Sequence, residues 1–411
     1  MRIYACSALR LVVGVWRMKT NLLPLREIYI MLKLPSINEN IAAIQRFREM
    51  AEAHGAIDLM RPYTVLLRPN ALVDSLAQRL SVSTKYAPLE GSPELREAIA
   101  KRLSDRYFRK INPDTEITIT AGATQALFCA VAASVGEGDE VIVFEPSHPT
   151  YAEVIAISGA RTVYMPLRPD FTVDWVEVQK VINSRTKLIV VCSPHQASGV
   201  AFCDDDWEML QKLISGTKIR VVSDEVIGEM AYPACVPASI GFYPRLSESA
   251  FVIGSLSKAL CVAGWKIGYC VAPEGLTAPL RRTLSAIANS INHPMQLAFA
   301  AYMQQAPSTV LFPYADVLAE HRQMALDALI GSCFEPVVPH YGYNMVLDYS
   351  AHSSMPDVDL AERLIVEHNV AVMPMSVYYH DKQQRQQVYI NLGVHRNDLL
   401  EALQRLRNIK L

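Results

Sequence analysis

From Ile117 onward, the chain alternates short runs of β-branched and aliphatic residues with stretches whose apolar spacing is helical. Seven of these runs are ITITAG, VIVFEP, TVYMPL, LIVVCSP, IRVVSDE, FVIGSLSK and IGYCVA. They are apolar throughout instead of alternating apolar with polar residues, which is typical of strands buried on both faces. The alternation with helices therefore predicts an α/β fold, with a mostly parallel sheet between two layers of helices.

The C-terminal third predicts a smaller α+β domain, because FEPVVP, YNMVLDYS, VAVMPM and VYINLGV lie between helical stretches there. Ahead of the large sheet, INENIAAIQRFREM predicts a helix with one apolar face, and Ser92-Pro93 predicts the start of another helix. The domain organisation that we expect is an ill-defined arm over 1–32, the N-terminal part of the small domain over 33–75, the large domain over 76–304 and the C-terminal small domain over 305–411.

Charge and cysteine use exclude several classes of function. Lys and Arg number 39 and Asp and Glu 41, with no polybasic run, so we expect neither a nucleic acid nor a membrane as a partner. The 8 cysteines form no C-x-x-C pair and no His cluster has metal-ligand spacing, which predicts reduced thiols in a cytoplasmic protein without a metal site. The first apolar stretch is too short to span a bilayer and lacks a cleavage pattern, and Met18 and Met31 are alternative starts.

Polar residues that directly follow the apolar runs are the first candidates for a ligand site, because ligands bind at the carboxyl ends of parallel strands. After ITIT, the small residues Gly122, Ala123 and Thr124 leave backbone amides open at the start of a helix, where phosphate is favoured, although such a segment also serves as a plain turn. Asp224 ends the run VVSD, where a carboxylate needs a partner. That partner is either a protonated pyridine nitrogen or an ordinary helix cap or salt bridge.

Ser255 and Lys258 follow the run FVIG, and Lys266 precedes the next strand. A lysine that is partly desolvated at such a place has a lowered pKa and can form an imine with a carbonyl cofactor. Ser255 and Lys266 are then placed to hold a phosphate group of that cofactor.

Taken together, these segments resemble the class I and II aminotransferases of fold type I, which use pyridoxal 5'-phosphate (PLP), and the kynurenine and methionine aminotransferase branch above all. The resemblance extends over about residues 33–411, where KYAPLEGSPELREAIA, TITAGATQALF, GDEVIVFEPSHPTYAEV, VVSDEV, GSLSKALCVAGWKIGYCVAP and VAVMPMSVYY stand in the order of the family. It implies a mostly parallel seven-stranded sheet in a three-layer α/β/α large domain that binds PLP, together with the smaller α+β domain.

The resemblance also implies a role for each candidate residue. Lys258 is the residue that forms a Schiff base with PLP, and Asp224 binds the pyridinium nitrogen. The residues implied for the phosphate are Gly122, Ala123, Thr124, Ser255 and Lys266. Tyr86 matches a tyrosine that reaches the phosphate of the neighbouring subunit, which implies a homodimer with active sites at the interface. His148 stands where the family usually stacks an aromatic ring on the cofactor.

The sequence departs from the family pattern mainly around the substrate. Gln196 in SPHQASG replaces the asparagine that bonds the 3-hydroxyl of the cofactor, and Ile227 replaces a tyrosine that donates to it, which predicts a raised pKa of the Schiff-base nitrogen. Asn391 in VYINLGV replaces the arginine that clamps the substrate's α-carboxylate. Arg61 in LMRPY is either the source of the missing charge or a surface residue.

We therefore expect a cytoplasmic PLP-dependent aminotransferase that transfers an amino group between an amino acid, or a related amine, and a 2-oxo acid. In this reading Lys258 moves the proton as general base and acid, while Asp224 sustains the electron sink. Two alternatives stay open. One is another PLP reaction, that of a β-lyase, racemase or decarboxylase, and the other is a PLP-binding regulator without turnover.

Overall fold

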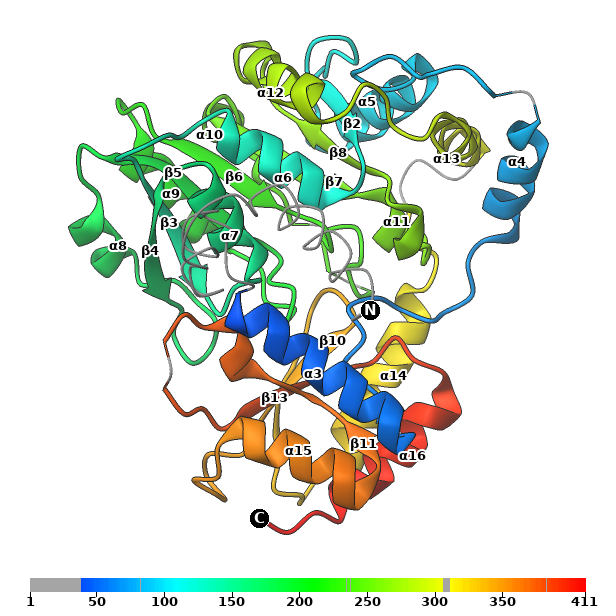
Figure 1. Ribbon diagram of the computed structural model, residues 1–411, viewed down its shortest axis with the longest axis vertical. Coiled ribbons are helices and arrows are strands. Elements are labelled where there is room, and N and C mark those ends of the chain that lie inside the picture. The colour runs from blue at the N-terminus through cyan, green and yellow to red at the C-terminus, as the bar shows by residue number, and fades with distance from the viewer. Residues whose placement is uncertain (1–37, 82, 234, 237, 306–310, 382) are drawn as a thin grey trace, which may run out of the picture. The chain divides into compact units, whose positions relative to one another are not determined.

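The computed structural model describes residues 38–81, 83–233, 235–236, 238–305, 311–381 and 383–411 (Figure 1). The predicted arm over 1–32 and the alternative starts at Met18 and Met31 lie outside the described residues. Residues 40–411 form one compact unit, and the predicted boundaries between a large and a small domain inside this unit stay a prediction. None of the described helices is long and apolar enough to cross a membrane.

A seven-stranded sheet forms from the seven apolar runs. Neighbouring strands are parallel except at β8, which runs antiparallel to both β2 and β7. The prediction of a mostly parallel sheet is therefore confirmed. In sheet order the strands are β2 (Ile117–Thr120), β8 (Gly268–Val271), β7 (Ala250–Ser255), β6 (Arg220–Asp224), β5 (Thr186–Cys192), β3 (Glu140–Glu145) and β4 (Arg161–Pro166).

Both faces of this sheet are covered by helices. Successive residues of a strand point to opposite faces, so Ile142 joins one hydrophobic core while Val143 joins the other. Val143's core includes three helices from the same part of the chain as the sheet and continues into the helices of the C-terminal part; the three are α6 (Ala123–Ala132), α7 (Thr150–Ile157) and α12 (Glu274–Ile287). The helices of Ile142's core are α4 (Asn70–Leu80), α5 (Pro93–Tyr107), α8 (Trp175–Val181), α9 (Asp204–Ile214), α10 (Pro244–Ser247) and α13 (His293–Gln305). This arrangement is the three-layer α/β/α fold (Figure 1).

A second, four-stranded antiparallel sheet lies in the C-terminal part of the chain, where the sequence predicts an α+β region. Its order is β12 (Met373–Pro374), β13 (Gln387–Asn391), β10 (Asn344–Asp348) and β9 (Glu335–Val337). The helices of this part are α14 (Ala315–Ala328), α15 (Asp357–His368) and α16 (Arg396–Arg407). Short helical turns complete the described elements: η1 (Ile240–Phe242), α11 (Leu256–Ala259), η2 (Ala263–Trp265) and η3 (Met375–Tyr378).

An N-terminal strand is built into this C-terminal part. β1 (Ile57–Asp58) pairs in parallel with β11 (Val370–Ala371). Just beyond it, the backbone amide of Asn391 donates to the carbonyl of Leu59 at 2.8 Å. The segment 57–59 is therefore held by β11 and β13, two strands from near the other end of the sequence.

Two helices begin where the sequence predicts. α3 (Glu39–His54) buries Ile44 and Phe47 on its apolar face. α5 (Pro93–Tyr107) has Pro at its first position, and the Ser92 hydroxyl oxygen accepts a hydrogen bond from a backbone amide of the first turn. Proline has no backbone N–H, but the N–H at the first helical position would have no partner within the helix in any case. Ser92 and Pro93 therefore begin the helix without the loss of a hydrogen bond.

Candidate active site

One cavity of about 390 Å³ gathers the predicted cofactor residues at the carboxyl ends of the parallel strands. Parallel strands end at the same edge of a sheet, which is why residues far apart in the sequence meet there. Tyr86 is the one predicted cofactor residue that is absent from its wall. Those present are Gly122, Ala123, Thr124, His148, Gln196, Asp224, Ser255, Lys258 and Lys266.

Asp224, the last residue of β6, is a buried carboxylate with three donors. The Tyr151 hydroxyl donates to it at 2.5 Å, the Gln196 amide at 3.3 Å and the Val226 backbone amide at 3.2 Å. Burial raises the pKa of Asp224, against the effect of these donors and of the positive charge of Lys258. A cation in the cavity would keep this carboxylate ionised, so the residue fits a protonated ring nitrogen.

Lys258 lies one turn beyond β7, on α11. The Ser255 hydroxyl oxygen caps this turn by accepting from the backbone amide of Lys258 at 3.3 Å. The ammonium Nζ donates to Gln196 Oε1 at 3.1 Å. Burial lowers the pKa of Lys258, while the charge of Asp224 raises it. A lowered pKa leaves more of the amine neutral, and the neutral amine is the nucleophile that attacks a carbonyl.

The start of α6 and the Lys266 side chain form a cradle that suits a phosphate. Gly122 precedes the helix with φ 76°, and a Cβ at this position would lie 2.9 Å from Lys266 Cε. A Cβ on Gly268 would lie 2.6 Å from the backbone nitrogen of Ala123. Glycines at both positions let the backbone amides of the helix start and the Lys266 ammonium face one space. This donor set fits an anion.

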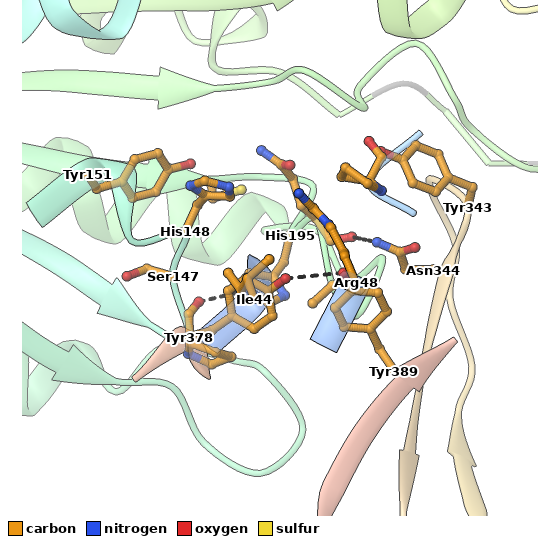
Figure 2. A pocket seen from close by; sticks show the side chains of 15 residues that line it. Ile44, Arg48, Ser147, His148, Tyr151, His195, Tyr343, Asn344, Tyr378 and Tyr389 are labelled. Atoms are coloured by element: carbon orange, nitrogen blue, oxygen red, sulfur yellow. Dashed lines mark hydrogen bonds between the residues drawn. The ribbon is translucent and has the colours of Figure 1, made fainter. Parts of the chain in front are cut away.

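A second cavity, of about 70 Å³, adjoins the first (Figure 2). Pro62, His148, Tyr151 and Gln196 line both cavities, so one ligand can extend from one into the other. Figure 2 shows further walls that come from α3 and from the C-terminal part of the chain. These walls contain Ile44, Arg48, Tyr343, Asn344, Tyr378 and Tyr389.

Among the described residues on the wall of this second cavity, Arg48 carries the single formal charge. Burial lowers the pKa of His195 to about 4. His148 borders the open cavity, yet desolvation by its surroundings and the charges of Lys258 and Arg48 also lower its pKa. Burial raises the pKa of Tyr378 to about 12. Both imidazoles and the phenol are therefore neutral at pH 7.

Arg61 and Asn391, the two predicted substrate residues, are absent from the walls of both cavities. The Asn391 amide nitrogen donates to the carbonyls of Arg61 and Tyr63 at 2.7 and 2.8 Å, and its oxygen accepts from the Gly393 amide at 2.6 Å. The Arg61 guanidinium pairs with Asp58 at 3.0 Å. The structure therefore does not bring these two side chains to the site.

Tyr86 is 88% exposed and touches neither cavity. Its predicted reach into a neighbouring subunit stays a prediction. No group of described His, Cys, Asp or Glu residues could hold a metal ion.

Two residues of the site, Tyr151 and Arg48, were not predicted from the sequence. Tyr151 lies three residues after His148, so its position one turn away at the start of α7 was a usable signal. Arg48 lies four residues after the apolar Ile44 on α3, and both side chains line the second cavity. A charged residue on the helical face next to the apolar stripe was the signal there.

The fold, the buried lysine and aspartate and the phosphate cradle together define a PLP-dependent enzyme of fold type I. The family described as Aminotransferase class I and II matches residues 68–406, and the chain belongs to this family. The predicted family, fold class and cofactor are thereby confirmed.

The relatives of this chain are aminotransferases. Methionine aminotransferase from Escherichia coli (strain K12) is 35% identical over 380 residues, which are 92% of this chain and 97% of that protein. Arginine–pyruvate transaminase AruH from Pseudomonas aeruginosa is 30% identical over 308 residues, 74% of this chain and 76% of that protein. The crystal structure of YbdL from Escherichia coli, which identifies a methionine aminotransferase function, has a TM-score of 0.86 and 34% identity, covering 92% of this chain and 98% of that one.

The chain is therefore an aminotransferase, and the predicted transfer of an amino group between an amino acid and a 2-oxo acid is confirmed as its class of reaction. The alternative of a PLP-binding regulator finds no support among these relatives.

Proposed function

We propose that this aminotransferase binds PLP in the 390 Å³ cavity and accepts amino acids with a neutral, apolar or aromatic side chain in the adjoining cavity. The observation that carries the proposal is the set of residues that line the smaller, adjoining cavity. They supply aromatic rings, hydroxyls and aliphatic surface around one formal positive charge.

Each cofactor residue has a task that its geometry supports. Asp224 keeps the proton on the ring nitrogen, since its buried carboxylate is the anionic partner that the proton needs. Lys258 Nζ is the amine that would hold the cofactor covalently. The amides of Ala123 and Thr124 at the start of α6 would hold the phosphate, with Lys266 and Ser255 beside them, whereas the Gly122 amide already donates to the Thr120 carbonyl at 2.8 Å. When bound, PLP supplies an electron sink for the negative charge that develops on the substrate's α-carbon.

Lys258 Nζ is also the group that would move a proton from the substrate's α-carbon. It lies 3.1 Å from Gln196 Oε1, and Gln196 is itself hydrogen-bonded to Asp224. Gln196 thus links the amine of Lys258 to the carboxylate of Asp224. Because burial lowers the pKa of Lys258, more of the amine is neutral, and the neutral amine can take up the proton as a base and return it as an acid.

The neutral walls select the substrate's side chain. A second carboxylate, as in aspartate or glutamate, would enter a cavity whose described wall has no further cation to match it. Burying an unpaired anion is strongly unfavourable. The relative with 35% identity is named for methionine, a substrate with a neutral thioether side chain, which agrees with this choice. The acceptor is a 2-oxo acid with one carboxylate.

We infer in addition that the enzyme is a cytoplasmic homodimer with a large and a small domain. Tyr86 is 88% exposed on the single chain, which suits a residue that completes the site of a second copy. A tyrosine so exposed has little stabilising contact within its own subunit.

Absorbance spectroscopy of the PLP-loaded enzyme tests the proposal. Methionine, leucine and phenylalanine should convert the absorbance band of the lysine-bound cofactor to that of the amino form of the cofactor, while aspartate and lysine should react at least tenfold more slowly. Preference for aspartate would contradict the proposed substrate class. The Lys258→Ala variant serves as the control, since its cofactor should show no lysine-bound band; persistence of the band would remove Lys258 from its role.

A further inference from the structure

Both substrates of an aminotransferase carry a carboxylate, and this group must leave water when it enters the site. A desolvated carboxylate requires a positive charge or several hydrogen-bond donors, and a guanidinium supplies both in a fixed fork. Residue 391, where the family resemblance implies an arginine, is an asparagine in this chain.

The side-chain amide of Asn391 has no hydrogen-bond donor left for a ligand. Both of its amide hydrogens are donated to the carbonyls of Arg61 and Tyr63, its oxygen is occupied by Gly393, and the residue is 0% exposed. It therefore serves the backbone of the segment after β1. Arg61 is equally unsuited, because its guanidinium pairs with Asp58 outside both cavities.

The two lysines of the site are already placed toward the cofactor. Lys266 lies over Gly122 at the phosphate cradle, and Lys258 contacts Gln196 next to Asp224. Both line the larger cavity and neither lines the smaller one.

Arg48 is the cation that faces the smaller cavity. It extends from α3, one turn beyond Ile44, among the side chains of His148, Tyr378 and Tyr389 (Figure 2). All four residues line the same cavity, and the positive charge of Arg48 acts to lower the pKa of His148 and opposes the rise that burial causes in the pKa values of Tyr378 and Tyr389. Within the part of the chain that the structure describes, Arg48 has no acidic partner, unlike its neighbour Arg46, which pairs with Glu362 at 2.7 Å.

We propose that Arg48 binds the carboxylate of the amino acid and of the 2-oxo acid, and that it replaces, from a different helix, the arginine that is absent at position 391. The inference rests on the proposed function, in that the smaller cavity is taken as the substrate's place. His148 and Gln196 border both cavities, so a substrate held by Arg48 has its amine directed toward the cavity of Lys258. The hydroxyl pair of Tyr378 and Tyr389, 3.1 Å apart, borders the same space and supplies neutral polar surface.

The experiment uses the PLP-loaded enzyme and its Arg48→Gln, Arg48→Lys and Arg46→Gln variants. Calorimetry measures the Kd of 3-phenylpropionate, which carries the carboxylate and lacks the amine. Absorbance measures KM for phenylalanine and for 2-phenylethylamine, which carries the amine and lacks the carboxylate. Arg46→Gln is the matched control, because it removes the same charge from the same helix at a residue outside the cavity.

We expect Arg48→Gln to raise the Kd of 3-phenylpropionate and the KM for phenylalanine by about tenfold or more, as the loss of a charge-assisted pair requires. The constants for 2-phenylethylamine should change less than about twofold, since no carboxylate is involved. The Kd and KM values of Arg48→Lys should lie between those of the wild type and Arg48→Gln, because lysine keeps the positive charge but lacks the planar guanidinium that forms two parallel hydrogen bonds. Arg46→Gln should match the wild type.

Equal binding of 3-phenylpropionate and equal KM for phenylalanine in the wild type and Arg48→Gln would overturn the role of Arg48 while leaving the proposed function intact. A parallel loss with 2-phenylethylamine would also overturn it, because the effect would then be structural. A wild-type enzyme that neither binds 3-phenylpropionate nor reacts with phenylalanine would instead refute the proposed substrate class, and this inference with it.

Discussion

The Tyr151 hydroxyl donates a hydrogen bond of 2.5 Å to the carboxylate of Asp224. Burial and the neighbouring carboxylate raise the pKa of Tyr151 well above its ordinary value, so the hydroxyl keeps its proton and stays a donor. The family resemblance places a tyrosine at position 227, where this chain has a buried isoleucine. Tyr151 directs its hydroxyl to the aspartate from α7, on another side of the cavity.

Tyr151→Phe should weaken PLP binding by about tenfold, because one hydrogen bond to a charged group is lost. Without this donor the pKa of Asp224 rises further, and less of the carboxylate is ionised to hold the ring proton. Fluorescence titration of the enzyme with PLP measures the Kd. Tyr232→Phe is the control: its buried hydroxyl has no hydrogen-bond partner in the described structure, so its removal should leave the Kd unchanged. Equal Kd values in both variants would refute the role of Tyr151.

Gly268→Ala should weaken PLP binding by at least about tenfold and lower the stability of the protein by about 1–3 kcal/mol. The added Cβ would lie 2.6 Å from the backbone nitrogen of Ala123, and the start of α6 has to move to admit it. Equilibrium dialysis with PLP and urea unfolding measure the two effects. Gly275→Ala, where a Cβ meets no atom within 4 Å and which lines neither cavity, should keep the PLP affinity of the wild type. A Gly268→Ala enzyme with unaltered PLP affinity would show that the cradle does not bind the phosphate.

Asn391→Asp should destabilise the protein by about 2–4 kcal/mol near pH 7, because one oxygen of the buried carboxylate would face the carbonyls of Arg61 and Tyr63 without a donor, while the other keeps the Gly393 amide. The pKa of the new carboxyl is raised in the folded state, so the loss of stability should shrink as the pH falls. Urea unfolding at pH 7 and pH 5 measures both effects. The exposed Asn112→Asp change keeps its acceptor oxygen for the Asp114 amide and should be close to neutral. A stable, pH-independent Asn391→Asp protein would contradict the buried geometry.

The stability of the protein should depend on pH through His195. Its pKa is lowered from the ordinary value of 6.5 to about 4 because the ring is buried, with Nε2 donating to the Pro146 carbonyl. The unfolded chain binds the proton more readily, so the contribution is fully present above about pH 6.5 and is lost as the pH falls toward 4. The loss is on the order of 3 kcal/mol. Urea unfolding of the wild type and His195→Gln from pH 7.5 to 4 should show their difference shrinking; a constant difference would mean that His195 titrates normally.

The large sheet and the cofactor site could be predicted because one sequence pattern, an apolar strand that ends in polar residues, indicates both. Strands buried on both faces must be apolar throughout, so the polar residues that end them, such as Asp224, stand out in the sequence. Lys258 and Gly122 could be recognised in the sequence in the same way. Each lies within a few residues of the strand that positions it, so no knowledge of distant contacts is needed.

The substrate side could not be predicted in that way, because its residues meet through pairing between the two ends of the chain. Arg48 on α3 and Tyr389 on β13 line one cavity, and the pairing of β1 with β11 and the ion pair between Arg46 and Glu362 link these two parts of the chain. Asn391 was assigned to the substrate from its position in the family pattern, whereas its partners are backbone carbonyls and an amide. Backbone groups are present at every residue, so a sequence does not reveal which of them a side chain will bind.

The parallel pairing of β1 with β11 also sets an order of events during synthesis of the chain. α3 and β1 leave the ribosome first, yet β1 has no strand partner until residues 370–371 have been made. All seven strands of the large sheet lie before residue 272 and can pair earlier. The large sheet that positions the cofactor residues can thus form before the second cavity is complete, and a chain cut short before residue 370 would keep Lys258 and lack Tyr378 and Tyr389 from that cavity's wall.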